Sequence, residues 1–309
     1  VPSPGVGAPP LVVPGQEAGG EDMVTAGRRL YASYSTLLAL CLGTMGLPHV
    51  VVRFYTNPDG RAARRTTLVV IGLLGIFYVF TPVYGVLGRV YVPSLPDGST
   101  GDSIVLLLPS AMAPGSLGTS LLAILAAGAF AAFLSTASGL TVAMAGALDQ
   151  DVVRPTLSRL TGGEVGGITS FRIATLVATA MPCLLLWESQ GIGLATTVGL
   201  AFALAASTFC PLLVLGVWWR RLTRAGIAAG MTVGAVLATG AAAVSVLGLA
   251  RTGWIQTLAS QPAAWTVPIA FLVTIGVSLV TQSQVPEDVV RILFRLHTPE
   301  SVQLPRTRR

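Results

Sequence analysis

Three hydroxyl-bearing residues, Ser135, Thr136 and Ser138, lie in the middle of a strongly apolar stretch, FAAFLSTASGLTVAMAGALD at 130–149. If this stretch is a helix that crosses a bilayer, its backbone hydrogen bonds are internal. Side-chain hydroxyls and any loosened carbonyl are then the polar groups left to bind a ligand. Hard alkali cations prefer oxygen ligands, so the cluster is a candidate cation site.

The same hydroxyls have a second interpretation. Ser and Thr are common where membrane helices meet, because their hydroxyls bond to the carbonyl four residues earlier or to a neighbouring helix. Residue chemistry alone favours this packing role over a cation site.

A second candidate site is the sequence GTMGLP, in which Gly43, Gly46 and Pro48 fall within six residues. Gly adds backbone freedom and Pro removes a donor, so both weaken a helix. Broken helices line the substrate cavities of transporters, whereas an ordinary kink packs against a neighbour. Both interpretations stay open. Gly43, Thr44, Met45 and Gly46 are therefore candidates for the substrate pathway.

Composition indicates which elements must position these residues. The 309 residues are 52% hydrophobic and 10% charged, whereas roughly 25% charged is typical of soluble domains. The sequence therefore predicts an all-α polytopic membrane protein. Apolar runs of about 18 residues or more predict about seven transmembrane helices, at about 31–52, 67–92, 117–148, 170–187, 191–219, 225–249 and 264–281.

Arginine predicts the orientation, since the chain contains no lysine. If the first span runs from outside to inside, 15 arginines lie on the cytoplasmic side and four outside. Positive-inside bias then places the N-terminus outside and the C-terminus in the cytoplasm, as in a multi-pass plasma membrane protein. Loops that face anionic lipid account for the net charge of +6, so membrane lipid is an expected partner and nucleic acid is not.

The remaining motifs predict packing more often than chemistry. Cysteines and histidines have no metal spacing, and no nucleophile and base pair is found, so neither an enzyme nor a catalytic residue is expected.

Asp149 and Asp151 begin an inner segment, 149–172, that we expect to be a solvated loop beside Arg154. The segment 93–115 contains the apolar run IVLLLPSAMAP, which is too short to span and predicts a re-entrant or surface helix.

Two later spans add polar and small residues. Thr196 and Thr197 lie in the fifth span and are further substrate-pathway candidates, although interhelical hydrogen bonding is an equal alternative. In the sixth span, small residues repeat every four positions and predict a close-packing face, formed by Gly226, Gly230 and Gly234.

The stretch GTMGLPHVVVRFYTNPDGRAARR resembles the signature of the sodium/solute symporter family, and closely that of its cation/acetate symporter (acetate permease) branch. Three further stretches agree in order and spacing: AFLSTASGL at 132–140, VGLAFALAASTFCPLLVLGVWWRRLTRAGIAAGM at 198–231 and FRLHTPE at 294–300. Together they cover nearly everything from about residue 31 onward.

The resemblance implies a leucine-transporter-type fold, in which two inverted five-helix repeats enclose the cation and substrate sites. The chain would hold core helices 6–10 plus C-terminal extra helices, and the N-terminal helices that complete the core would be missing. The family's sodium site maps onto the carbonyl of Ala132 and the hydroxyls of Ser135 and Thr136. These positions are i, i+3 and i+4 and share one helical face. The resemblance therefore favours cation binding over packing for Ser135 and Thr136, whereas Ser138 is expected to pack or to support the site without contacting the ion.

The function implied is sodium-coupled symport of acetate or a related short monocarboxylate by the complete protein, with proton coupling left open. Its partners would be the sodium ion and a small carboxylate, with no cofactor and no further metal. The alternatives are a truncated, non-transporting fragment and a symporter-related membrane sensor. The expected divisions are an extracellular loop or truncated N-terminus at 1–28, a partial symporter domain at 29–284 and a cytoplasmic basic tail at 285–309.

Overall fold

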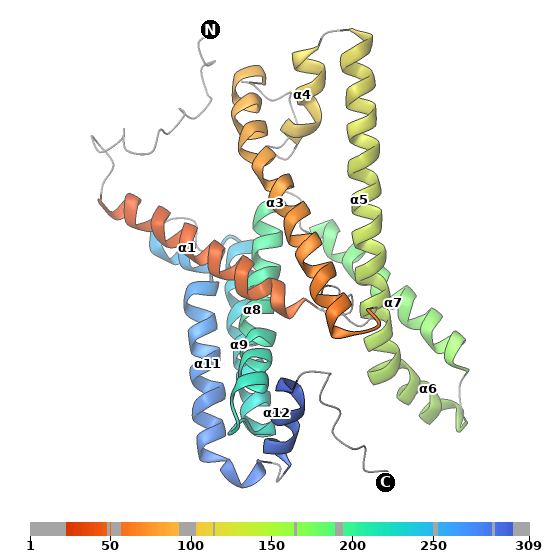
Figure 1. Ribbon diagram of the computed structural model, residues 1–309, viewed down its shortest axis with the longest axis vertical. Coiled ribbons are helices and arrows are strands. Elements are labelled where there is room, and N and C mark those ends of the chain that lie inside the picture. Colours follow the sequence, from red (N-terminus) through yellow and green to blue (C-terminus); the bar gives the residue numbers. More distant parts are fainter. Residues whose placement is uncertain are drawn as a thin grey trace. The chain divides into compact units, whose positions relative to one another are not determined.

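A computed structural model describes residues 23–47, 50, 57–92, 103–113, 115–163, 166–188, 194–249, 253–285 and 288–298. These residues are almost entirely helical, and none of them forms a strand (Figure 1). The all-α class predicted from composition is therefore confirmed. The chain divides into two compact units, one built around 57–193 and one that joins 20–56 to 194–309.

Six helices in the described ranges are long and apolar enough to cross a membrane, as expected for a multi-pass membrane protein. They are Gly60–Tyr91, Ser116–Thr161, Gly167–Leu184, Thr196–Trp218, Arg224–Val246 and Ala263–Val280. Each lies at one of the seven predicted spans. The remaining prediction, 31–52, begins in helix α1 (Met23–Gly46), which is not among the six, and most of its residues after Leu47 lie outside the described part.

The first unit contains α3 (Gly60–Tyr91), α4 (Ile104–Met112), α5 (Ser116–Leu148), the π-helical turn η2 (Asp149–Val153), α6 (Arg154–Thr161) and α7 (Gly167–Glu188). The side chain of Asp59 caps α3 by accepting a hydrogen bond from the backbone N–H of Ala62 (2.6 Å). The predicted short segment forms α4, which contacts both α3 and α5 (Figure 1). Helix α5 also packs against α7.

The second unit contains α1, α8 (Leu194–Trp218), α9 (Arg224–Val246), α10 (Gly253–Ser260), α11 (Ala263–Val280), the 3₁₀ turn η3 (Gln282–Gln284) and α12 (Val289–His297). Helix α8 contacts α1, α9 and α11 (Figure 1). The core where they meet consists of small side chains: Ala39, Ala203, Ala206, Ala263 and Val267. Small residues let helix backbones approach closely, which suits helices that associate in lipid.

The glycine repeat of α9 faces α11, so the predicted packing face is confirmed. All three glycines are buried. A Cβ atom added at Gly226 would meet Ser278, and one added at Gly230 would lie 2.9 Å from the Cβ atom of Thr274. The order of contacts is reversed along α11, so the two helices run antiparallel with interlocking small residues.

We expect Gly234→Ala to destabilise the second unit. The new Cβ atom would meet the backbone carbonyl of Ser207, with its carbon 2.8 Å away, and backbone atoms cannot move aside without shifting α8. Overpacking of this kind costs about 1–3 kcal/mol. The matched control is Gly240→Ala on the same helix, where an added Cβ has no neighbour within 4 Å. Thermal unfolding of the detergent-solubilised chain, followed by tryptophan fluorescence, should show a lowered midpoint only for Gly234→Ala, and equal midpoints would contradict the packing described.

Candidate functional site

The three residues of the predicted cation site lie on α5 in the first unit. Ala132, Ser135 and Thr136 are all exposed within the unit. Neither hydroxyl makes a hydrogen bond to any residue that the structure describes. By contrast, Thr175 and Thr179 of α7 donate to the carbonyls four residues earlier, at 2.8 and 2.9 Å. The packing role proposed for hydroxyls in such a helix is thus not fulfilled by Ser135 or Thr136 in the described part of the chain.

The surroundings of the pair are apolar. Phe130, Phe133 and Leu134 are 67%, 62% and 69% exposed, so the hydroxyls emerge from a surface that carries large hydrophobic side chains. A hydroxyl in hydrocarbon without a hydrogen-bond partner costs several kcal/mol. This surface therefore requires a partner for its oxygens, which can be a cation, another helix or both.

The α5 oxygens by themselves do not complete a cation shell. Hard cations such as calcium take about six to eight oxygen ligands, and one carbonyl plus two hydroxyls supply three. Among the described residues, no group of three or more His, Cys, Asp or Glu side chains is placed to hold a metal. The α5 face can supply part of an oxygen shell, with the remaining ligands from another segment.

The predicted pathway glycines of α1 lie in the second unit and pack against α8. Gly43 and Gly46 are buried. A Cβ atom at Gly46 would lie 2.8 Å from the Cβ atom of Phe209 and 2.9 Å from the carbonyl oxygen of Ala205. Helix α1 is continuous through Gly46, and both glycines pack closely against α8. Pro48, the third residue of the candidate break, falls outside the described residues.

The other four predicted pathway residues lie on α1 and in the first turns of α8. Thr44 and Met45 are exposed, and the Thr44 hydroxyl donates to the carbonyl of Leu40 (2.6 Å). Thr196 is half-buried and Thr197 is exposed, both in the first turns of α8. Gly43 packs against Phe202 of α8. Both threonines lie about 8 Å before Phe202 along the axis of α8. The structure therefore does not bring the threonines of α8 against the glycines of α1.

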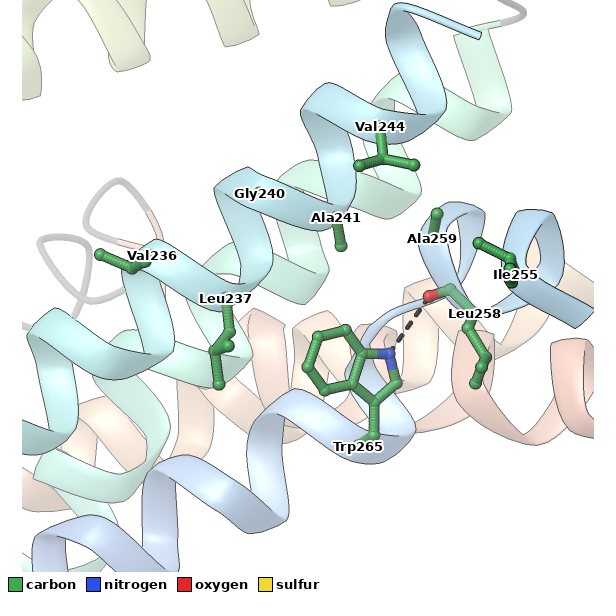
Figure 2. A pocket seen from close by; sticks show the side chains of 9 residues that line it. All are labelled: Val236, Leu237, Gly240, Ala241, Val244, Ile255, Leu258, Ala259 and Trp265. Carbon is green, nitrogen blue, oxygen red and sulfur yellow. Dashed lines mark hydrogen bonds between the residues drawn. The ribbon is translucent and has the colours of Figure 1, made fainter. Parts of the chain in front are cut away.

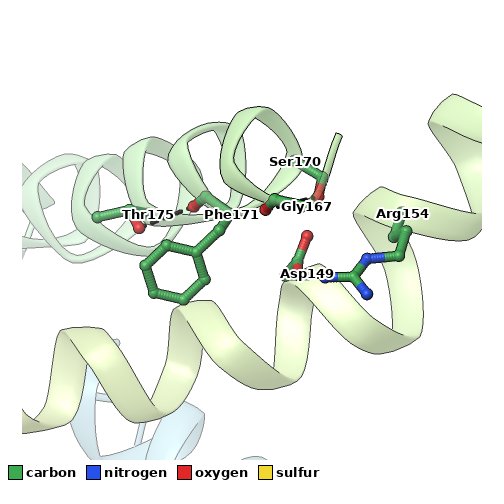
Figure 3. Close-up of polar contacts among 6 residues, drawn as sticks. All are labelled: Asp149, Arg154, Gly167, Ser170, Phe171 and Thr175. Carbon is green, nitrogen blue, oxygen red and sulfur yellow. Dashed lines mark hydrogen bonds and ion pairs between the residues drawn. The ribbon is translucent and has the colours of Figure 1, made fainter. Parts of the chain in front are cut away.

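One ion pair was not predicted, and Figure 3 shows it. Asp149 was expected on a solvated loop, but it is 4% exposed and belongs to the π-helical turn that continues α5. Its Oδ2 atom lies 2.6 Å from Nη2 of Arg154. Asp151 is exposed, as predicted. The correction has a physical reason: a buried carboxylate needs a counter-charge, and the five-residue spacing to Arg154 fits one π turn.

The ion pair lies beside the start of α7 (Figure 3). A Cβ atom at Gly167 would lie 3.4 Å from Nη2 of Arg154, and the buried Ser170 hydroxyl donates to the carbonyl of Gly167 (3.2 Å). The Oδ1 atom of Asp149 is buried without a hydrogen-bond partner among the described residues. The paired carboxylate lies at the junction of α5, α6 and α7, where the ion pair joins the π-helical turn to α6.

A pocket of about 310 Å³ in the second unit does not suit a carboxylate or a cation (Figure 2). Its lining comes from α9, α10 and the start of α11 and is apolar throughout, from Val236 on α9 to Ile255 on α10. The polar atom of Trp265, the indole Nε1, already donates to the carbonyl of Leu258 (3.2 Å). The pocket therefore offers a ligand an apolar surface and no free charge or oxygen cluster.

The sequence pattern of the sodium:solute symporter family matches residues 16–234, well over half of the 309 residues. The chain belongs to the sodium:solute symporter family. The matched range includes all of α1, α5 and α8, and with them every predicted cation-site and pathway residue. Membership of this family indicates a transporter rather than an enzyme.

A relative in Bacillus subtilis (strain 168), named Uncharacterized symporter YwcA, is 29% identical over 293 residues. The aligned region covers 90% of this chain and 56% of the relative. The symporter-family chain thus spans about half the length of the curated relative it matches. No solved structure matches the chain significantly.

Proposed function

We propose that this chain is the C-terminal portion of a sodium-coupled symporter that carries acetate or a related short monocarboxylate across the plasma membrane. The observation that carries the proposal is the pair of unpartnered hydroxyls on α5, Ser135 and Thr136. Family membership supplies the class of function. The hydroxyls supply a chemical reason for a cation to bind at this depth in an apolar helix.

The proposed sodium site uses the carbonyl of Ala132 and the hydroxyls of Ser135 and Thr136. Their i, i+3 and i+4 spacing places the three oxygens on one face of α5. A bound sodium ion removes the penalty of two unsatisfied hydroxyls in hydrocarbon. It also couples transport to the membrane potential, which is worth about 2.3 kcal/mol per charge per 100 mV.

The remaining oxygen ligands would come from helices outside this chain. Three oxygens fill about half of a typical hard-cation shell, and the chain spans 56% of its relative. Both facts favour a protein in which core helices 6–10 of a leucine-transporter-type fold pair with a preceding inverted repeat. A fragment without that repeat has no site to alternate, so the proposal assigns transport to the complete protein. A non-transporting fragment and a symporter-related sensor are the alternatives that it does not favour.

The substrate class rests on the stretches that resemble the acetate permease branch. Thr44 and Met45 are exposed beside the α1 glycines, so they remain candidates to line the pathway, as do Thr196 and Thr197. Buried glycines at 43 and 46 contribute by letting α1 approach α8 closely. The proposal therefore assigns substrate contact to the threonines and methionine, and helix positioning to the glycines.

We expect Ser135→Ala combined with Thr136→Ala to raise the half-saturating sodium concentration of the complete transporter about tenfold or more. Each lost oxygen ligand weakens binding by about 1 kcal/mol, and 1.4 kcal/mol corresponds to tenfold. The measurement is uptake of radiolabelled acetate into proteoliposomes at a series of sodium concentrations. Ser138→Ala is the matched control, because it removes an exposed α5 hydroxyl of the same helix. Unchanged sodium dependence in the double variant, or an equal shift in the control, would contradict the site.

We also expect an antibody against the C-terminal residues 299–309 to detect a native polypeptide of about 51 kDa. This mass is the aligned 90% of the chain's 31.8 kDa divided by the 56% of the relative that the match covers. The proposed cytoplasmic C-terminus predicts that intact cells bind the antibody only after permeabilisation. A product near 32 kDa would favour the fragment alternative, and binding to intact cells would reverse the proposed orientation.

A further inference from the structure

A second pocket, of about 290 Å³, lies where α12 meets the end of α8. Its lining has two chemical halves. Leu293 and Phe294 of α12 contribute apolar surface, and Arg220 and His297 contribute cationic or polar nitrogen atoms. Trp218 of α8 lies in the same lining. This combination differs from the wholly apolar groove of Figure 2.

One contact between aromatic rings joins α8 to α12 at the pocket. The rings of Trp218 and His297 lie 4.9 Å apart between centroids and are tilted by 58°. The His297 Nδ1 atom lies 2.8 Å from the carbonyl oxygen of Leu293, and a carbonyl only accepts, so Nδ1 carries the proton. The other ring nitrogen, Nε2, is then a hydrogen-bond acceptor in the neutral ring, so Arg220 is the donor that the pocket offers to an anion.

The face of α12 that lines the pocket is only partly covered by protein. Val290, Leu293, Phe294 and His297 have i, i+3, i+4 and i+7 spacing and so form one helical face. Val290 and Phe294 are nevertheless 58% and 61% exposed. Apolar side chains beside this pocket therefore remain available for a further apolar ligand.

The position of the pocket indicates what that ligand is. Helix α8 is a candidate membrane span that ends at Trp218, and Trp219, Arg220 and Arg221 follow. Tryptophan followed by arginine is typical of the headgroup level of a bilayer. Basic side chains at that level attract anionic lipid. Asp288, before the start of α12, is exposed and adds one opposite charge.

We propose that this pocket binds one anionic phospholipid, with its phosphate diester at Arg220 and the start of an acyl chain against Leu293 and Phe294. The charge of the lipid complements the basic half of the pocket, and its chain covers the apolar half. Bound lipid would fasten α12 to the end of α8. The proposal does not depend on what the transporter carries.

The test uses the full chain in zwitterionic nanodiscs that contain a minor fraction of acyl-brominated lipid, which quenches nearby tryptophan fluorescence. Brominated phosphatidylglycerol is compared with brominated phosphatidylcholine at the same mole fraction. We expect stronger quenching by phosphatidylglycerol, and we expect Trp218→Phe to remove this difference, because the other tryptophans do not line the pocket. An equal difference in Trp218→Phe would overturn the assignment of the pocket.

Variants of the basic half give the affinity test. Arg220→Gln should lower the apparent affinity for phosphatidylglycerol about fivefold, the factor that corresponds to about 1 kcal/mol for one arginine near a membrane surface. Arg159→Gln, which removes an exposed arginine from α6, is the matched control. Both are surface changes, and their unfolding midpoints are measured alongside.

Two results would overturn the proposal. The first is equal quenching by the anionic and the zwitterionic lipid, which would mean that the pocket is an ordinary lipid-facing surface. The second is full reversal of the Trp218 quenching difference by excess inorganic phosphate at constant ionic strength, which would assign the basic half to a free phosphate. Persistence of the difference in phosphate supports the lipid, because a free anion leaves the apolar half of the pocket unfilled.

Discussion

Polar groups in hydrocarbon must find a partner in the protein or in a bound ion, because no water is present to hydrogen-bond them. The second unit meets this constraint between its own helices. Ser207 of α8 and Thr266 of α11 share a hydrogen bond of 2.7 Å, and the Ser35 hydroxyl of α1 donates to the carbonyl of Gln261 (2.7 Å). On α5 of the first unit, Ser135, Thr136, Ser138 and Thr141 have no hydrogen-bond partner among the described residues, and the first two belong to the proposed cation site. The proposed function follows from this difference.

Close approach between helices is the other feature on which the second unit depends. Glycines of α9 and α1 bring these helices close to the backbones of their neighbours. The Ser and Thr residues that face the α9 glycines are small and also form hydrogen bonds. In lipid, packing and interhelical hydrogen bonds replace the hydrophobic driving force. The small residues of this unit therefore act as scaffold and orient α1 and α8, which carry the pathway candidates.

The parts of the fold that could be predicted are those that local composition determines. Apolar length located six candidate spans, and the four-residue repeat of glycines identified the α9 packing face. Composition misled at Asp149, since a charged segment resembles a solvated loop, whereas the pairing with Arg154 and contact with α7 hold it inside a helix. Gly43 and Gly46 stayed ambiguous in sequence because glycine both weakens a helix and permits close packing, and only the position of α8 decides between these roles. The cation site came from family resemblance, and the structure contributes the free hydroxyls.

The most direct test of the central claim is equilibrium binding of radioactive sodium to the purified complete transporter in detergent, without substrate. The account predicts saturable binding that unlabelled sodium displaces and potassium does not, and that Thr136→Ala weakens strongly. The absence of saturable sodium binding to a correctly folded protein, or unchanged binding in Thr136→Ala, would contradict it.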